Sequence, residues 1–208
     1  MRMIEGAGGR IGETDALEAM FIARKEVFVD LLGWEVPVIA GEYEVDQFDN
    51  PDARYLILLD DDGRHRASAR LLPTDRPHIL DTLYSDLCEE TVPRGPDVLE
   101  VTRFCLDRRQ TATERRDARN RLVSALAISA LANGIRRYTG VADVPWFNQV
   151  RTFGWRCRAL GTPRRHGRQM LSALCIDIDD DVMAGLASSG IYDPGDADRV
   201  PQMAGLAA

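Results

Sequence analysis

The chain has 208 residues, of which 45% are apolar and 28% are charged, the composition of an ordinary soluble globular protein. No stretch approaches the ~18 consecutive apolar residues of a membrane span, and the first ten residues lack the apolar core of a secretory signal, so we expect a cytoplasmic protein with no membrane partner. The four cysteines and three histidines form no close pairs, which argues against a disulfide scaffold and against a metal site.

The net charge of −7 conceals a strong asymmetry along the chain. Residues 1–102 carry 22 acidic and 10 basic side chains, residues 103–175 carry 4 and 15, and residues 176–208 carry 7 and 1. All the basic residues except Lys25 are arginines, which can hold phosphates or an acidic partner through forked hydrogen bonds. The acidic total and the lack of a recognisable binding motif argue against a nucleic-acid partner.

The first half of the chain predicts a helix, a loop and a hairpin in that order. Apolar residues at helical spacing predict a helix over residues 15–32. Residues 33–51 follow as an acidic loop, too rich in carboxylates to belong to the core. Two apolar runs, residues 54–59 and 67–72, flank the turn sequence Asp-Asp-Asp-Gly and predict an antiparallel hairpin. A short helix is expected near residues 82–88.

The second half predicts strands around one long helix. Residues 98–106 are typical of a mostly buried strand. Capping-box spacing at Thr111 and Glu114 predicts the start of a helix that ends at Asn133-Gly134. The remaining expected elements are a strand over 136–144, a helix over 146–153, and strands over 155–160 and 170–178.

This order of elements predicts an α/β sandwich, with one mixed sheet and helices on both faces. We expect a single domain over residues 1–180, followed by a small, polar and weakly ordered tail over residues 181–208. The sequence lacks Gly-x-Gly-x-x-Gly, a Walker loop, Gly-x-Ser-x-Gly and His-Glu-x-x-His, so dinucleotide-binding, P-loop, esterase and zincin chemistries have no signature here.

An ordered set of polar and aromatic residues runs through the first half of the chain. Phe28 follows Arg24 by one helical turn, and Trp34 comes just after the predicted helix. The set continues with Glu44, Asp46, Asp49, Arg70, Glu100, Arg103 and Phe104. In this pattern the sequence resembles the acyl-homoserine-lactone synthases, the LuxI-type autoinducer synthases, over roughly residues 20 to 160.

The resemblance implies a fold like that of the N-acetyltransferases, in which the acyl donor enters where two parallel strands splay. Here those strands would be residues 98–106 and 136–144. It also implies acyl transfer from an acyl-carrier-protein or acyl-CoA thioester to the amine of S-adenosylmethionine, followed by lactone closure and release of methylthioadenosine. The product of such an enzyme is a quorum-sensing signal. Both compounds are substrates, so the resemblance implies no cofactor.

The residue types suit the chemistry of S-adenosylmethionine, which presents a sulfonium, an ammonium, a carboxylate and an adenine ring. We expect Phe28 and Trp34 to meet the cation and the adenine with their π faces. Asp46 and Asp49 would supply negative potential, and Arg24 would hold the substrate carboxylate in a forked pair. The alternative for these charged residues is a structural ion-pair network, and for the aromatic residues it is the core.

Glu100 is the candidate general base for the attacking amine, directly or through a water. Arg103 would stabilise developing negative charge or position S-adenosylmethionine, and the resemblance adds Glu44 to the catalytic set. Because residues 100 and 103 of a regular strand point to opposite faces, we expect a bulge between them. The alternative for Glu100 is a structural pair with an arginine.

Three further sets of residues complete the predicted site. Arg70 is assigned to a structural ion-pair network with the acidic run. The predicted walls of the acyl pocket are Phe104, Ala142, Trp146 and Phe147. The predicted docking residues for an acyl-carrier protein or the phosphates of coenzyme A are Arg115, Arg116 and Arg119, for which a solvated helix face is the alternative.

Two other functions remain open at this point. One is an acyltransferase of the same fold that acts on another amine, and the other is a non-catalytic module that binds a carrier protein or nucleic acid through the basic middle third of the chain. Acyl-chain length and type, the choice between the two donors and the oligomeric state depend on pocket shape and partner surfaces.

Overall fold

The computed structural model describes residues 1–7, 14–193 and 195. The contacts within the chain divide it into two compact units. Among the described residues, the N-terminal unit takes those up to 71, residues 103–125, and residues 193 and 195. The C-terminal unit takes residues 72–102 and 126–192. Both units contain strands, and the single domain expected over residues 1–180 stays a prediction.

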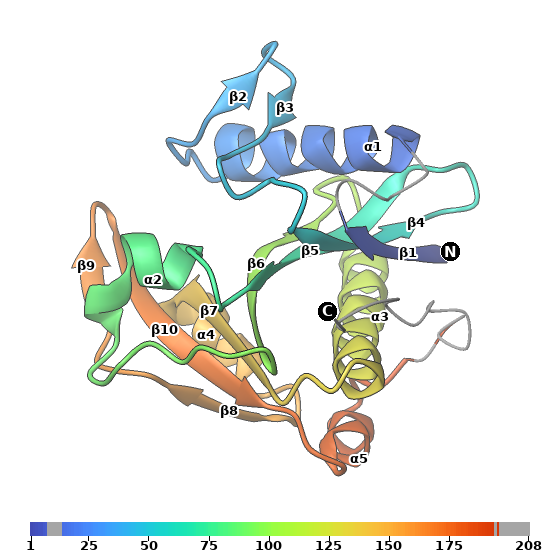
Figure 1. Ribbon diagram of the computed structural model, residues 1–208. Helices are drawn as coiled ribbons and strands as arrows, with labels where there is room; N and C mark the ends of the chain where they lie inside the picture. The colour runs from blue at the N-terminus through green and yellow to red at the C-terminus, as the bar shows by residue number, and fades with distance from the viewer. Residues whose placement is uncertain (8–13, 194, 196–208) are drawn as a thin grey trace. The chain divides into compact units, whose positions relative to one another are not determined.

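The N-terminal unit is built on three antiparallel strands, β1 (Arg2–Ala7), β4 (Arg54–Leu59) and β5 (His65–Pro73), with β4 in the middle. The hairpin of β4 and β5 confirms the sequence prediction, whereas β1 was not predicted. Nearly every residue of β4 is buried, because both faces of this strand are covered. Figure 1 shows α1 (Thr14–Arg24) along one side of these strands and the beginning of α3 (Ala112–Ala132) along the other.

The predicted helix over residues 15–32 is present but changes type. After α1 the backbone continues as a π-helical segment, η1 (Lys25–Leu31), and the turn after it reaches Gly33, whose φ of +66° suits a residue without a Cβ. The acidic segment that follows is no simple loop, since β2 (Val38–Ile39) pairs with β3 (Tyr43–Glu44) in a small hairpin. The expectation that this segment lies outside the core was wrong, as the burial of its carboxylates shows below.

The C-terminal unit holds a second group of strands. Their order is β6 (Val98–Leu106), which belongs to this unit up to Thr102, then β7 (Arg137–Asp143), β10 (Gln169–Asp177) and β8 (Arg156–Ala159); β9 (Arg164–His166) also pairs with β10. Strands β6 and β7 are parallel, and their ladder runs only from Val98–Arg137 to Glu100–Thr139. The ladder ends at that pair although both strands continue, so the splayed parallel pair that the sequence predicted is confirmed.

Helices cover both faces of the strands in the C-terminal unit. The cluster of α2 (Ile79–Leu83) and η2 (Ser85–Leu87) packs on Leu171 and Ala173 of β10. Side chains alternate along a strand, and on the other face Tyr138 Oη of β7 donates to Leu126 O of α3 at 2.9 Å. Helix α4 (Val144–Val150) follows β7 directly, with Asp143 as its N-cap. The reciprocal bonds of Thr111 and Glu114 confirm the predicted capping box of α3.

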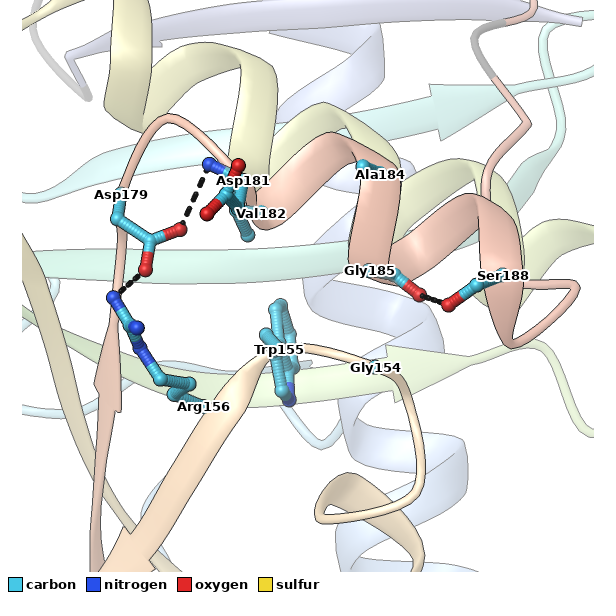
Figure 2. Close-up of a pocket in the computed structure, with 9 residues that line it drawn as sticks. All are labelled: Gly154, Trp155, Arg156, Asp179, Asp181, Val182, Ala184, Gly185 and Ser188. Carbon is cyan, nitrogen blue, oxygen red and sulfur yellow. Dashed lines mark hydrogen bonds and ion pairs between the residues drawn. The ribbon is translucent and has the colours of Figure 1, made fainter.

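The segment after residue 180 is not a weakly ordered tail from its start. Helix α5 (Val182–Ser188) buries Val182 and Leu186, and Ile191 beyond it is also buried. Figure 2 shows α5 beside the loop at Gly154. A Cβ added to Gly185 would lie 2.2 Å from Gly154 O, so only glycine allows this approach. The rest of the predicted tail, residues 194 and 196–208, lies outside the described residues.

Among the residues that the structure describes, no helix combines the length and apolar character that crossing a bilayer requires.

Candidate active site

Three arginines and three carboxylates of the N-terminal unit form a closed ring of ion pairs. The ring runs from Arg24 to Glu44, Arg103, Asp46, Arg70 and Asp49, and back to Arg24. Its members come from α1, β3, the segment after β3, β5 and the second part of β6. We call this set the ion-pair ring. Each member contacts two members of opposite charge, and the six formal charges sum to zero.

Arg24 holds the inner part of the ion-pair ring and is fully buried. Its Nε donates to Glu44 Oε2 at 2.6 Å, and its Nη1 and Nη2 form a fork on Asp49 at 2.8 and 2.9 Å. Burial alone would lower the pKa of Arg24, but the bonds to Asp49 and Glu44 outweigh it and raise this pKa above its usual value. The guanidinium that we expected on a substrate carboxylate is thus bound to protein carboxylates.

Asp49 is the most heavily bonded carboxylate of the ring. Besides the fork from Arg24, it accepts from Tyr55 Oη at 2.8 Å and from Asp46 N at 2.8 Å, and Arg70 Nη1 lies 2.8 Å away. Burial would raise the pKa of Asp49, but the bonds and charges of the two arginines hold it well below its ordinary range. Asp49 is therefore ionised and acts as the electrostatic anchor between α1 and β5.

Arg70 confirms its predicted place in a structural network. Its Nη1 and Nη2 form a fork on Asp46 at 2.7 and 3.0 Å, and its side chain is buried. Burial would raise the pKa of Asp46, and the bond from Arg70 together with the charges of Arg70 and Arg103 lowers it. The sequence analysis did not identify Tyr55 as a member of the site. Tyr55 is directly opposite Arg70 in the β4–β5 register, so the residue pairs of the predicted hairpin would have indicated it.

Arg103 lies at the open side of the ring. Its Nε donates to both oxygens of Glu44 at 3.1 Å, and its Nη2 donates to Asp46 Oδ2 at 2.6 Å. Its side chain and that of Asp46 are each 10% exposed, whereas Glu44 is fully buried. Arg103 has a φ of +51°, which L-residues rarely adopt within a strand. This left-handed residue lies at the end of the interval, residues 100 to 103, in which we predict a bulge, and the bulge itself stays a prediction.

An aromatic pair borders the guanidinium of Arg103. The rings of Phe28 and Trp34 are stacked, with centroids 4.7 Å apart and planes 18° from parallel. The guanidinium carbon of Arg103 lies 5.6 Å from the Phe28 centroid and 5.8 Å from the Trp34 centroid. The indole Nε1 of Trp34 is buried and has no hydrogen-bond acceptor among the described residues. This region thus combines two aromatic faces with the carboxylates of Glu44 and Asp46 around one cation.

Glu100 belongs to the C-terminal unit and is fully buried. Its Oε1 accepts from Leu80 N, in the first turn of α2, at 2.9 Å. In the parallel register it is opposite Thr139, so its side chain lies on the α2 face of these strands. The backbone amide of Leu80, at the N-terminus of α2, is thus one partner of this carboxylate.

The predicted acyl-pocket residues fall in both units. Ala142 is near the end of β7, and Trp146 and Phe147 lie on α4, which starts one residue after β7; Phe104 belongs to the N-terminal unit. Ala142 and Phe147 are each 6% exposed, and the ring of Trp146 meets that of Phe153 edge to face. The structure thus brings Ala142, Trp146 and Phe147 together on consecutive elements of the C-terminal unit.

The predicted docking arginines lie near the start of α3. Arg115 and Arg116 are exposed, and Arg116 is within 4.0 Å of the neighbouring Asp117. Arg119 is half-buried and donates to the side chain of Asn120. A separate pocket of about 360 Å³, drawn in Figure 2, is lined by Trp155, Arg156, Asp179 and residues of α5. None of the predicted site residues lines that pocket.

The sequence matches the autoinducer synthase family over residues 10–186. Among curated relatives, the acyl-homoserine-lactone synthase of Ralstonia nicotianae is 35% identical over 191 residues, which cover 88% of this chain and 92% of the relative. The acyl-homoserine-lactone synthase of Agrobacterium fabrum is 32% identical over 164 residues, which cover 76% of each chain.

Solved structures agree with this match. TofI, in a ternary complex with an inhibitor and MTA, has a TM-score of 0.76 and 30% identity, covering 93% of this chain and 98% of that one. MesI, a CoA-dependent acyl-homoserine lactone synthase, has a TM-score of 0.81 and 25% identity, covering 98% and 99%. An acyl-CoA N-acyltransferase from Pseudomonas aeruginosa, at a TM-score of 0.57 and 16% identity, shares the fold alone and confirms the predicted fold class. By the family match and by these relatives, the chain belongs to the autoinducer synthases.

Proposed function

We infer that the chain is an acyl-homoserine-lactone synthase. It transfers an acyl group from the thioester of an acyl-carrier protein or of coenzyme A to the amine of S-adenosylmethionine. The carboxylate of the acylated product then displaces the thioether from the sulfonium carbon, which closes the lactone and releases methylthioadenosine. The family match over residues 10–186 and the curated relatives support this reaction.

The observation that carries the proposal is the environment of Arg103. Stacked aromatic faces from Phe28 and Trp34, together with carboxylates from Glu44 and Asp46, surround its guanidinium. Such a combination also stabilises a sulfonium or an ammonium ion, because a π face and a carboxylate both attract positive charge. We propose that S-adenosylmethionine binds against this aromatic pair, with Arg103 beside it as the residue that positions its carboxylate.

The buried residues of the ion-pair ring hold the substrate-binding carboxylates in position. Arg24 and Asp49 are almost completely buried and bonded to one another, so we propose that they hold Glu44 and Asp46 in place rather than touch substrate. This assigns Arg24 a positioning role in place of the substrate contact expected from the sequence. Arg70 acts in the same way on Asp46.

Glu100 is the proposed general base. Its carboxylate is fixed by the bond from Leu80 N, and it stands at the last pair of the β6–β7 ladder. Where the ladder ends, backbone N–H groups of the two strands are no longer bonded to each other, and one of them can donate to the thioester carbonyl. A carboxylate at this position can accept the amine proton, directly or through a water, as nitrogen attacks that carbonyl.

We propose that the reaction needs no cofactor, since both reactants are substrates, and that it takes place in the cytoplasm, where acyl thioesters and S-adenosylmethionine are made. Ala142, Trp146 and Phe147 are the proposed acyl-pocket walls within the C-terminal unit. Dialysis against a chelator should leave turnover unchanged; a loss that an added metal ion restores would contradict this proposal.

The test of the function is the search for its products. Cells that express the chain should release an acyl-homoserine lactone detectable by mass spectrometry, and cells that express Glu100→Gln should not. The purified chain, given S-adenosylmethionine and a panel of acyl-carrier-protein and acyl-CoA thioesters, should release methylthioadenosine with at least one of them. If no donor supports this release by a folded chain, the proposed function is wrong.

A further inference from the structure

The outer edge of the strands in the C-terminal unit carries a run of arginines. Residues 151–168 contain six arginines, one histidine and no acidic residue, although the whole chain has a net charge of −7. Strand β8 is the last in the strand order, and β9 pairs with the same side of β10 further along (Figure 1). We call Arg158, Arg164, Arg165 and Arg168 the edge arginines.

The edge arginines have no acidic partner, in contrast to some other exposed arginines of the same unit. Arg94, for example, lies 2.7 Å from Asp81, and Arg156 at the same edge pairs with Asp179. All four edge arginines are exposed, and within the described part of the chain none has a carboxylate at ion-pair distance. Four guanidinium groups without a paired carboxylate on one edge of an acidic protein produce a local positive potential, although Asp86 pairs with His166 within the same run.

The strand register sets the spacing of these charges. Arg164 is opposite Leu171 of β10 and Arg158 is opposite Cys175, so both side chains lie on the same face, four residues apart along β10. At ~3.3 Å per residue this separation is about 13 Å. It corresponds to between two and three turns of an α-helix at ~5.4 Å per turn. The spacing suits carboxylates placed at intervals along one acidic helix.

A small phosphate compound fits this arrangement less well. Phosphates are bound where several N–H donors converge in a concave site, whereas the edge arginines are exposed and spread along β8, β9 and the turn after β9. The same run of residues begins at Arg151, the C-cap of α4, and α4 carries Trp146 and Phe147 of the proposed acyl pocket. An acidic protein that docks on this edge would thus contact the segment that continues directly from the acyl-pocket helix.

We propose that the edge arginines dock the acidic helix of an acyl-carrier protein that delivers the acyl thioester, an inference that rests on the proposed function. It places the docking surface on β8 and β9 instead of on Arg115, Arg116 and Arg119. A competing explanation is that positive charges on an edge strand prevent strand addition between molecules. That role requires charge alone and involves no acidic partner.

The test compares two variants that remove the same number of charges. In the edge variant, Arg158, Arg164 and Arg165 are each replaced by Gln, and in the α3 variant Arg115, Arg116 and Arg119 are each replaced by Gln. Binding of a fluorescently labelled bacterial acyl-carrier protein is measured by anisotropy at low and high salt, which requires no turnover. We expect the edge variant to bind at least tenfold more weakly with a smaller salt dependence, and the α3 variant to bind within twofold of the parent.

The other outcomes overturn either the docking proposal or the proposed function, and they can be told apart. Weaker binding by the α3 variant alone moves the surface to α3. Unchanged binding by the edge variant, with larger assemblies in gel filtration, supports protection of the edge instead. An equal rise in KM for an acyl-CoA donor identifies a phosphate site. Carrier-protein binding by the parent without methylthioadenosine release from any donor overturns the proposed function alone, whereas release from acyl-CoA without carrier-protein binding overturns the docking proposal alone.

Discussion

At the scale of single residues, the ion-pair ring explains how six charged side chains can lie in the interior. A buried charge is costly unless it is paired, and here each carboxylate has two arginine neighbours. The ring also makes its members interdependent, because the loss of one leaves two charges short of a neighbour. Arg103 and Asp46 have the only partly exposed side chains of the ring, so substrate contact is expected there and structural support elsewhere.

Asp49→Asn tests the structural part of the ring. The substitution removes the negative charge that faces both Arg24 and Arg70, and breaking such a buried pair costs about 3–5 kcal/mol. We expect the free energy of unfolding in urea to fall by that order. Asp61→Asn is the control, because that side chain is 96% exposed, and its unfolding should match the parent. Equal stability of both variants would show that the ring contributes nothing to folding.

Trp34 tests the proposed substrate contact. A desolvated cation–π contact contributes about 2 kcal/mol, which corresponds to about thirtyfold in affinity. We therefore expect Trp34→Ala to raise the KM for S-adenosylmethionine at least tenfold with a smaller effect on the KM for the acyl donor. Trp34→Phe, which keeps a stacking face against Phe28, should recover most of the loss. Should the two variants have the KM of the parent, the aromatic pair would belong to the core.

At the scale of elements, close contacts between backbones determine how neighbouring strands and helices pack, which the hydrophobic pattern of the sequence does not specify. Within β6, Arg103 has the positive φ of a left-handed residue, and the hydrogen-bonded ladder between β6 and β7 ends at Glu100. A Cβ on Gly140 would lie 2.9 Å from Val101 O, so β7 can approach β6 at this point only with glycine. Helix α5 is held by a similar contact between Gly154 and Gly185.

Gly185→Ala tests that contact. In an exposed helix this substitution would stabilise the fold by up to about 1 kcal/mol, because alanine favours helix. Here the added Cβ would lie 2.2 Å from Gly154 O, so we expect a lower melting temperature and faster proteolysis within α5. Ala187→Ser, on the exposed side of the same helix, should melt near the parent. A stabilised Gly185→Ala variant would mean that α5 does not dock as described.

At the scale of the whole molecule, acid should destabilise the fold through several buried groups at once. Burial, with a smaller effect of Arg66, lowers the pKa of His65 from 6.5 to about 3. The unfolded chain therefore binds a proton in this range that the folded chain does not. The contribution of neutral His65 to the free energy of unfolding is fully present above pH 6.5 and is lost as the pH falls toward 3. Asp46 and Asp49, whose pKa values are also lowered, add a further loss below about pH 4.

We expect the free energy of unfolding to fall by about 2 kcal/mol between pH 7 and pH 5 through His65. His65→Gln should be less stable overall at pH 7 but should lose less stability over this interval, measured by urea unfolding at each pH. A smaller slope remains because the pKa of His78 is lowered in the same direction, chiefly by burial. A slope in His65→Gln equal to that of the parent would exclude His65 as its origin.

The sequence by itself determined the local elements and the identity of the residues that matter. The hairpin of β4 and β5, the limits of β6 and the capping box of α3 follow from alternation, turn residues and capping, all of which act over a few positions. The spacing of Arg24, Phe28 and Trp34 and of the acidic run pointed to the family that the comparisons show.

Only the tertiary structure decided how these residues are used. The sequence of the acidic segment over residues 33–51 predicts an exposed loop. Its carboxylates are buried only because they pair with arginines up to 59 positions away, and local sequence does not show that pairing. Contacts distant in sequence likewise produce the closure of the ion-pair ring, the positive φ at Arg103 and the packing of α5 against the loop at Gly154. Local propensity acts within a few residues, whereas the burial of a charge is favourable only when opposite charges from other elements meet it, and that meeting is a property of the fold.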